Sequence, residues 1–189
     1  NELKDLKMDQ ARFGVDFNSV PDLNGIEISD GEKVAFDVNG YESIEFMVEP
    51  NPGEGLKPLV KIASGGETAR LMLALKNVLA KADATPTLIF DEIDQGIGGR
   101  VGSVVGQKLW NLGQSHQVLC ITHLAQLAGF GDAHFRVSKK LEEGRTTTIV
   151  TEIKENDRLM ELAQMLGDVS EGTLQSANEI VQSVGKIKD

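Results

Sequence analysis

Two hydrophobic patterns divide the chain into a β-rich beginning and a longer part in which helices and strands alternate. Apolar and polar residues alternate over 11–17, and again over 33–38 and 41–49, with Asn39-Gly40 between the last two runs. Alternation predicts strands, and an Asn-Gly pair between two such runs predicts a β-hairpin. Residues 18–32 are rich in turn-forming residues and predict a loop.

After residue 60 the apolar spacing becomes that of helices separated by short strands. A spacing near 3.6 residues predicts four helices, over 65–82, 100–113, 157–166 and 171–184. Residues expected to face the core are Leu71, Ala74, Leu75, Val78 and Leu79 in the first helix, Val101, Val104, Val105, Leu109 and Leu112 in the second, and Leu174, Ala177, Val181 and Val184 in the last.

Three further elements complete the second part. The runs TLIF (87–90) and QVLCIT (117–122) have the continuous apolar character of buried parallel strands. Residues 134–140 and 145–153 flank Glu143-Gly144 and predict an antiparallel hairpin. Helices that alternate with strands indicate a parallel α/β architecture, so we expect parallel strands with flanking helices plus antiparallel β hairpins.

Composition narrows the classes of function. No apolar run approaches the roughly 18 residues that a membrane span needs, so we expect no membrane partner. The net charge of −10 argues against strong non-specific nucleic-acid binding, which depends on Lys and Arg. Any DNA contact would need a local patch or another part of the molecule. The chain begins at Asn1 without a methionine, as expected of a piece of a longer protein.

The cysteine and histidine content points to a cytosolic protein without zinc. Cys120 stands alone in an apolar run, which is typical of a buried, reduced thiol. The histidines His116, His123 and His134 lack the spacing of metal ligands.

Ser64-Gly65-Gly66-Glu67 immediately precedes the apolar positions of the first long helix. A serine followed three residues later by a glutamate is a capping box. A helix N-terminus with two glycines is also an anion site, because a phosphate can approach its backbone N–H groups closely. Both interpretations fit, and they are compatible, since the capped helix end is what presents N–H groups to the phosphate.

Asp91 and Glu92 follow the strand TLIF at its carboxyl end, where open α/β sheets place their ligands. An aspartate there can hold Mg²⁺ and an adjacent glutamate can polarise a water, which suits nucleotide hydrolysis. The alternative is that two acidic residues simply enter a loop. His123 ends the strand QVLCIT and is either a neutral donor toward a phosphate oxygen or an ordinary loop residue. Close helix packing explains Gly102 and Gly106.

The order of these motifs resembles the second half of an ABC-type ATPase head, with its signature motif, Walker B strand, D-loop and switch histidine. The strings EFMVEPNPGEGLKPLVKIASGGE, LIFDEIDQGIGGRVG and VLCITHLAQLA closely resemble the RecN family, the bacterial DNA-repair members of the structural-maintenance-of-chromosomes class. Thr68 and Ala69 depart from the Leu-Ser that follows the signature in many of its members.

The resemblance implies a role for each motif residue. Ser64, Gly65, Gly66 and Glu67 would form the signature that contacts the γ-phosphate of ATP held by the opposite head of a dimer. Asp91 would serve the Mg²⁺ site, through water, and Glu92 would be the general base. Asp94, Gln95 and Gly96 would cross the dimer interface as the D-loop, and His123 would sense the γ-phosphate.

The resemblance also requires a P-loop, GxxxxGK[ST], which does not occur between Asn1 and Asp189. It therefore implies a split head, completed by an N-terminal Walker A half of the same protein. Residues 1–60 would be the end of a returning coiled coil and a β-rich lead-in, and 61–189 the lobe with the signature, Walker B and switch histidine. The head would form a homodimer around ATP and act in double-strand-break repair in the cytoplasm, at the nucleoid. It would contact DNA mainly through other regions.

Other functions stay open at this point. The chain could belong to another SMC-like or ABC-type ATPase, such as a transporter cassette, although its β-rich lead-in disfavours the latter. It could also be a module that binds nucleotide or a partner without turnover. The absent P-loop favours such a module for the isolated chain, whereas the Asp91-Glu92 pair favours hydrolysis for the parent.

Overall fold

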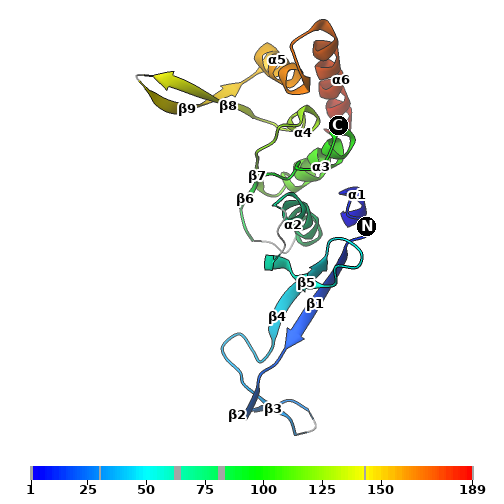
Figure 1. Ribbon diagram of the computed structural model, residues 1–189, viewed down its shortest axis with the longest axis vertical. Coiled ribbons are helices and arrows are strands. Elements are labelled where there is room, and N and C mark those ends of the chain that lie inside the picture. The colour runs from blue at the N-terminus through cyan, green and yellow to red at the C-terminus, as the bar shows by residue number, and fades with distance from the viewer. Residues whose placement is uncertain (1, 30, 62–64, 81–83, 143, 189) are drawn as a thin grey trace. The chain divides into compact units, whose positions relative to one another are not determined.

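The computed structural model describes residues 2–29, 31–61, 65–80, 84–142 and 144–188, and the chain divides into two compact units (Figure 1). The smaller contains residues 8–64, and the larger contains 1–7 together with 65–189. The assignment of residues 1–60 to a coiled-coil return and lead-in stays a prediction.

The smaller unit consists of two small antiparallel sheets. β4 (Ser43–Glu49) lies between β1 (Arg12–Asn18) and β5 (Lys57–Pro58). The second sheet pairs β2 (Pro21–Glu27) with β3 (Lys33–Val34), and the 3-10 helix η1 (Leu59–Lys61) follows β5. The loop predicted over 18–32 is wrong in part, because β2 lies within it.

The hairpin predicted across Asn39-Gly40 is also wrong. The turn itself is present, as Asp37 and Gly40 exchange backbone hydrogen bonds of 2.9 and 3.2 Å, but β4 pairs with β1 instead of with β3. The pairing with β1 is seven residues long and opposes apolar residues along one face. The opposed pairs are Phe13–Val48, Val15–Phe46 and Phe17–Ile44. Cross-strand apolar pairs stabilise a sheet, and the short run at β3 offers fewer of them.

The larger unit has the predicted parallel α/β centre. β6 (Thr87–Phe90) and β7 (Gln117–Cys120) pair in parallel. They pack with α1 (Glu2–Asp5), α2 (Gly65–Leu79) and α3 (Gly99–Leu112) around one apolar core. The predicted fold class, α/β with a parallel pair, flanking helices and antiparallel hairpins, is therefore confirmed.

The predicted inner faces of the helices are partly correct. In α3 the expected Val101, Val105, Leu109 and Leu112 are buried, and so are Gly102 and Gly106. In α2 the prediction of Val78 and Leu79 as core residues is wrong, because both are exposed. The buried face of α2 instead contains Gly66, Arg70, Leu71, Leu73 and Ala74. This rotation brings the first turns of α2 against the loop that follows β6.

Only one face of the β6–β7 sheet is covered, so the prediction of fully buried strands is wrong. Leu88 and Phe90 point into the core, whereas the alternate side chains of the sheet are exposed. These are Ile89 at 69%, Leu119 at 47% and Ile121 at 61% of their full exposure. Cys120, expected to be buried, is half-buried.

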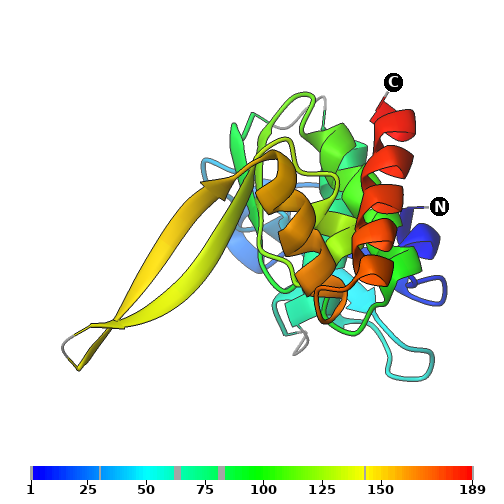
Figure 2. The same cartoon turned by 90° about the horizontal axis from the view of Figure 1, so that it is seen from above.

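The C-terminal part of the larger unit forms a second apolar cluster under helices α4 (Ala125–Ala128), α5 (Glu155–Leu166) and α6 (Glu171–Lys188). Ala177 and Val184 face inward as expected, but Val181 is exposed. The hairpin of β8 (His134–Glu142) and β9 (Arg145–Ile153) is confirmed, and it extends away from α5 and α6 (Figure 2). None of the helices described is long and apolar enough to cross a membrane.

Candidate functional site

The acidic pair lies just beyond β6, as its sequence position predicts. Asp91 and Glu92 are both exposed, and the backbone N–H of Glu92 donates to Asp91 Oδ1 at 2.9 Å. Glu92 has φ +55°, in the left-handed region that non-glycine residues rarely adopt. Such a conformation costs about 1–3 kcal/mol and persists only where surrounding contacts enforce it.

The glycines at the start of α2 lie against this acidic loop. A Cβ added at Gly65 would stand 2.6 Å from Glu92 Oε2. A Cβ at Gly66 would stand 2.9 Å from Gln95 Cβ and 3.1 Å from the carbonyl oxygens of both Glu92 and Gln95. The two motifs, 25 residues apart in sequence, therefore touch, and the contact requires residues without side chains at 65 and 66.

The proposed cap itself is only partly visible. Ser64 lies outside the residues that the structure describes, so the capping box that it would form with Glu67 stays a prediction. Glu67 lies in the first turn of α2, where a negative charge is favoured by the helix dipole. Its charge also acts on the guanidinium of Arg70, one turn further along the helix.

Arg70 ties α2 to the loop after β6. Its side chain is buried, and Nη1 donates to the carbonyl oxygens of Ile93 at 3.3 Å and Gln95 at 2.8 Å. Burial lowers the pKa of Arg70, an effect that the charge of Glu67 partly opposes. A buried arginine is expensive unless it is hydrogen-bonded, so these two bonds fix the position of the loop relative to the helix.

The loop between Glu92 and Ile97 is a tight double turn. Gln95 N–H donates to the carbonyl of Glu92 at 3.0 Å, and Ile97 N–H donates to that of Asp94 at 3.2 Å. Gly96 has φ +74°, a conformation that glycine adopts without strain. Gln95 and Gly96 are exposed, and their predicted role at a dimer interface stays a prediction.

Asp94 connects the loop to the end of β7. Its side chain is only 3% exposed, and Oδ2 lies 3.1 Å from His123 Nδ1. The same oxygen accepts a hydrogen bond from the backbone N–H of His123 at 2.9 Å and another from the Thr122 hydroxyl. The carboxylate is thus engaged within the chain, whereas the imidazole of His123 is 73% exposed.

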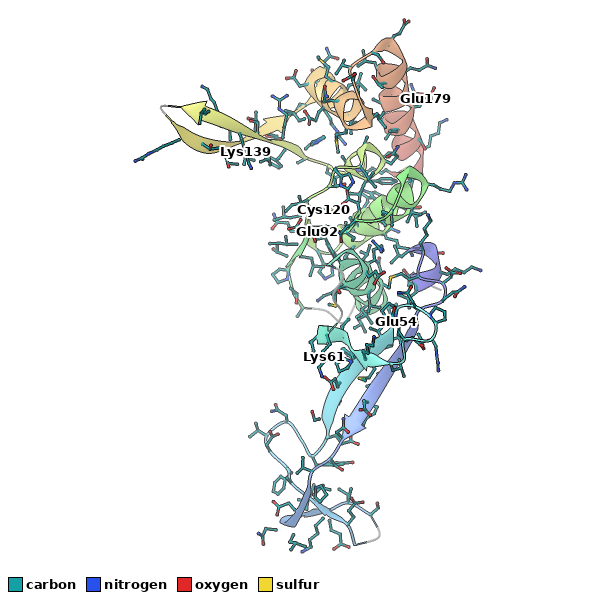
Figure 3. All side chains as sticks on the ribbon, viewed as in Figure 1. Glu54, Lys61, Glu92, Cys120, Lys139 and Glu179 are labelled. Atoms are coloured by element: carbon teal, nitrogen blue, oxygen red, sulfur yellow. The ribbon has the colours of Figure 1, made fainter. Side chains whose placement is uncertain are left out.

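Cys120 lies at the end of β7, under the acidic loop; Figure 3 labels it together with Glu92. Burial, followed by the negative charges of Asp94 and Asp91, raises the pKa of the Cys120 thiol to about 12. A thiol held protonated is a poor nucleophile and metal ligand, so Cys120 is a structural residue beneath the site.

The described residues suit a metal ion only in part. They contain no group of three or more His, Cys, Asp and Glu side chains placed to hold one. Asp91 is an exposed carboxylate at the carboxyl end of a parallel strand, which fits a single ligand to Mg²⁺. That ion commonly takes one or two carboxylates and completes its shell with water and substrate phosphates.

The structure therefore brings together nine of the ten residues singled out from the sequence, all in the larger unit; Ser64 is outside the described residues. Sequence reasoning missed Arg70 and Thr122. Arg70 is a charged residue among the apolar positions of α2, and Thr122 is a hydroxyl between an apolar strand and a histidine. Both signals are visible in the sequence, but neither identifies the backbone or side chain that it binds.

Comparisons with known proteins agree on one family. The chain is 39% identical to DNA repair protein RecN of Halalkalibacterium halodurans over 189 residues, which is 99% of this chain and 32% of that protein. It is 35% identical to DNA repair protein RecN of Bacillus subtilis over 191 residues, covering 99% of this chain and 33% of the relative. The chain spans about a third of the length of these curated relatives and corresponds to their C-terminal part.

Solved structures also align with the chain. The Smc head domain with an extended coiled coil, bound to the C-terminal domain of ScpA, from Pyrococcus furiosus, aligns with a TM-score of 0.48 and 19% identity. The alignment covers 80% of this chain and 33% of that one. No protein-family model matches the chain.

Proposed function

We propose that this chain, which is related to the C-terminal part of RecN proteins, forms half of an ATP-hydrolysing head. The other half, carrying the Walker A motif, comes from an N-terminal segment of the same protein. Two completed heads form a homodimer around ATP, and the cycle serves the repair of DNA double-strand breaks. Nucleotide favours the dimer because it binds the dimer better than the monomer, and hydrolysis releases it.

One observation carries this proposal: the start of α2, the loop after β6 and the end of β7 meet in one place. Gly65 lies against Glu92, and Asp94 lies 3.1 Å from His123 Nδ1. Folding alone does not require a helix N-terminus, two exposed carboxylates and an exposed imidazole to converge. Phosphoryl transfer does, because its catalysis is mainly positioning and electrostatic stabilisation.

Within its own head, the chain supplies three groups. Asp91 holds Mg²⁺ through water, and that ion, when bound, neutralises charge on the phosphates. Glu92 orients the attacking water and accepts its proton. His123 faces the γ-phosphate, and the D-loop residues Asp94, Gln95 and Gly96 lie toward the partner head.

Toward the opposite head, the chain presents the start of α2. Ser64, Gly65, Gly66 and Glu67 form the helix end that meets the γ-phosphate bound there, where backbone N–H groups and the helix dipole favour an anion. Glu92 Oε2 now lies beside Gly65. A carboxylate and a phosphate repel each other at so short a range, so Glu92 turns away when the opposite head brings its nucleotide.

The uncovered face of the β6–β7 sheet supports the N-terminal half as a partner. Ile89, Leu119 and Ile121 are 47–69% exposed on a parallel pair, whereas parallel sheets are buried on both faces. A Walker A half that packs on this face would cover them. With a net charge of −10, the chain itself is a poor DNA-binding surface, so DNA contacts lie mainly on other regions. A role in DNA repair places the protein in the cytoplasm, at the nucleoid.

The exposed sheet face also favours a second candidate function for the chain on its own. Without a P-loop and with Ile89, Leu119 and Ile121 uncovered, the isolated chain would act as a module that binds a partner without turnover. The two functions differ in whether ATP is hydrolysed when the Walker A half is present.

The test is ATPase activity of the chain alone and mixed with the N-terminal segment of its parent protein. Activity in the mixture only, lost in Glu92→Gln, supports the split head. Activity of the chain alone that survives Glu92→Gln would overturn the assignment of the site. A mixture that forms a complex but hydrolyses no ATP, with or without DNA, would favour the binding module.

A further inference from the structure

The deepest polar contact of the site joins two segments through a single carboxylate oxygen. Asp94 Oδ2 accepts from the Thr122 hydroxyl, from the backbone N–H of His123 at 2.9 Å, and lies 3.1 Å from His123 Nδ1. We propose that Asp94 is the positioning residue for His123, fixing the direction of its ring and the nitrogen that carries the proton. The catalytic value of this contact rests on the proposed ATPase function, but the contact itself does not.

The burial of the two side chains differs sharply. Asp94 is 3% exposed and His123 is 73% exposed. A buried carboxylate is costly unless several donors satisfy it. Two of its three donors, the Thr122 hydroxyl and the His123 backbone N–H, would suffice to connect the loop with the end of β7. The third donor is the ring of His123, which solvent could have hydrated equally well.

The proton arrangement follows from the acceptor. An ionised carboxylate accepts hydrogen bonds and has none to donate, so Nδ1 of His123 must carry the hydrogen. Nε2 then faces outward. In a neutral ring it presents a lone pair, which does not bind a phosphate oxygen; with a second proton it presents an N–H that does. The neutral donor expected from the sequence is therefore incompatible with this contact, and His123 would meet a phosphate as an imidazolium.

Thr122 completes the arrangement. Its hydroxyl donates to Asp94, and its oxygen accepts from the backbone N–H of Leu124 at 3.0 Å. The hydroxyl hydrogen is therefore directed at Asp94, and the backbone turn that carries His123 is held on both sides. Thr122 is a second positioning residue, acting on His123 through Asp94.

The test reads the ring nitrogens directly, by ¹⁵N NMR of the histidine side chains in this chain. Three proteins are compared at a pH where the rings are neutral: wild type, Asp94→Asn, and the matched control Asp132→Asn, whose exposed carboxylate pairs with Lys188. His123→Gln assigns the signal, and His116 and His134 serve as internal references. We expect the Nδ1–H tautomer of His123 in wild type and in Asp132→Asn, with a shift toward Nε2–H in Asp94→Asn.

Either of two results would overturn the proposal: the Nε2–H tautomer in wild type, or a His123 signal that Asp94→Asn leaves unchanged. Thr122→Val guards against misfolding of the aspartate variant, because it keeps the shape of the side chain and removes only the hydroxyl. It should give a smaller shift of the His123 signal in the same direction, and no shift would exclude Thr122 from the arrangement. Retention of the His116 and His134 signals reports that each variant is folded.

A double-mutant cycle in the completed ATPase then separates positioning from general structure. If Asp94 acts through His123, the variant with both Asp94→Asn and His123→Gln is no slower in kcat than the slower single variant, because coupled residues are not additive. Losses that multiply would show that Asp94 acts independently of His123. If the completed protein has no ATPase activity, the proposed function fails, while the NMR comparison still decides the contact between Asp94 and His123.

Discussion

Arg70 Nη1 lies 2.8 Å from the carbonyl oxygen of Gln95, so the helix with the glycine pair holds the loop with the acidic pair. The same nitrogen also donates to the carbonyl of Ile93. Asp94 holds the other side of this loop through Thr122 and His123. The loop is therefore fixed between α2 and the end of β7, and a displacement at the start of α2 is transmitted to Glu92.

Replacing Arg70 by methionine removes the guanidinium but keeps most of the apolar stem. Two buried carbonyl oxygens lose their donor, and we expect the free energy of unfolding to fall by about 1–3 kcal/mol. Urea unfolding of the isolated chain measures this change. Arg145→Met, on the exposed strand β9, is the matched control and should change stability by less than about 0.5 kcal/mol. Equal midpoints for the two variants would contradict the role of Arg70.

Gly66→Ala should destabilise the chain although alanine is the better helix former. The new Cβ would meet the carbonyl oxygens of Glu92 and Gln95 at 3.1 Å, and backbone cannot move aside as a flexible side chain can. We expect a loss of about 1–3 kcal/mol. Gly185→Ala in α6 meets no atom within 4 Å, so it should gain about 0.5–1 kcal/mol. Thermal unfolding of both variants compares the two effects, and stabilisation by both would show that the acidic loop does not touch α2.

Cys120 should react slowly with iodoacetamide in the folded chain. Its pKa is raised from 9.0 to about 12, which lowers the thiolate fraction at pH 8 by about a thousandfold. Because the folded pKa lies above the unfolded value, the contribution to stability is complete below pH 9 and disappears as the pH rises toward 12. Mass spectrometry of the alkylated protein gives the rate, with urea-unfolded chain as the fast reference. A folded chain that reacts as quickly as the unfolded one would contradict the burial of this thiol.

Local patterns in the sequence were sufficient for the elements that depend on neighbours along the chain. The spacing of Val101, Val105 and Leu109 predicted the inner face of α3, and the runs TLIF and QVLCIT predicted the parallel pair. The residues around Glu143-Gly144 predicted the β8–β9 hairpin. In each case the determining contacts lie within one element or between adjacent ones, so periodicity and turn chemistry carry the information.

The errors occurred where distant segments choose between alternatives. β4 pairs with β1, 31 residues apart at Arg12 and Ser43 by sequence number, because that register is longer and more apolar than the hairpin across Asn39-Gly40. The face of α2 turns toward the loop after β6 because Arg70 binds carbonyl oxygens there. Nothing local to Arg70 specifies those partners. The motif residues could be recognised from sequence, but the contacts that position them could not.

Glu92→Gln offers the sharpest test of the acidic pair, because it changes the chemistry of one side chain and little else. Glutamine keeps the size of glutamate, and position 92 keeps its backbone at φ +55°. Only the favourable charge of Glu92 near the start of α2 is lost, an effect of about 0.3–1 kcal/mol. A loss of activity in this variant therefore cannot be explained by unfolding.

In the completed head, Glu92→Gln should bind ATP as wild type does but hydrolyse it about 10²–10⁴-fold more slowly, since an amide cannot accept the proton of water. Because hydrolysis releases the dimer, the variant should accumulate as ATP-bound dimers, which size-exclusion chromatography with light scattering detects. Glu179→Gln, on the exposed surface of α6, is the control for losing one carboxylate. Wild-type turnover in Glu92→Gln would mean that another group accepts the proton, and slow turnover without trapped dimers would separate hydrolysis from dimer release.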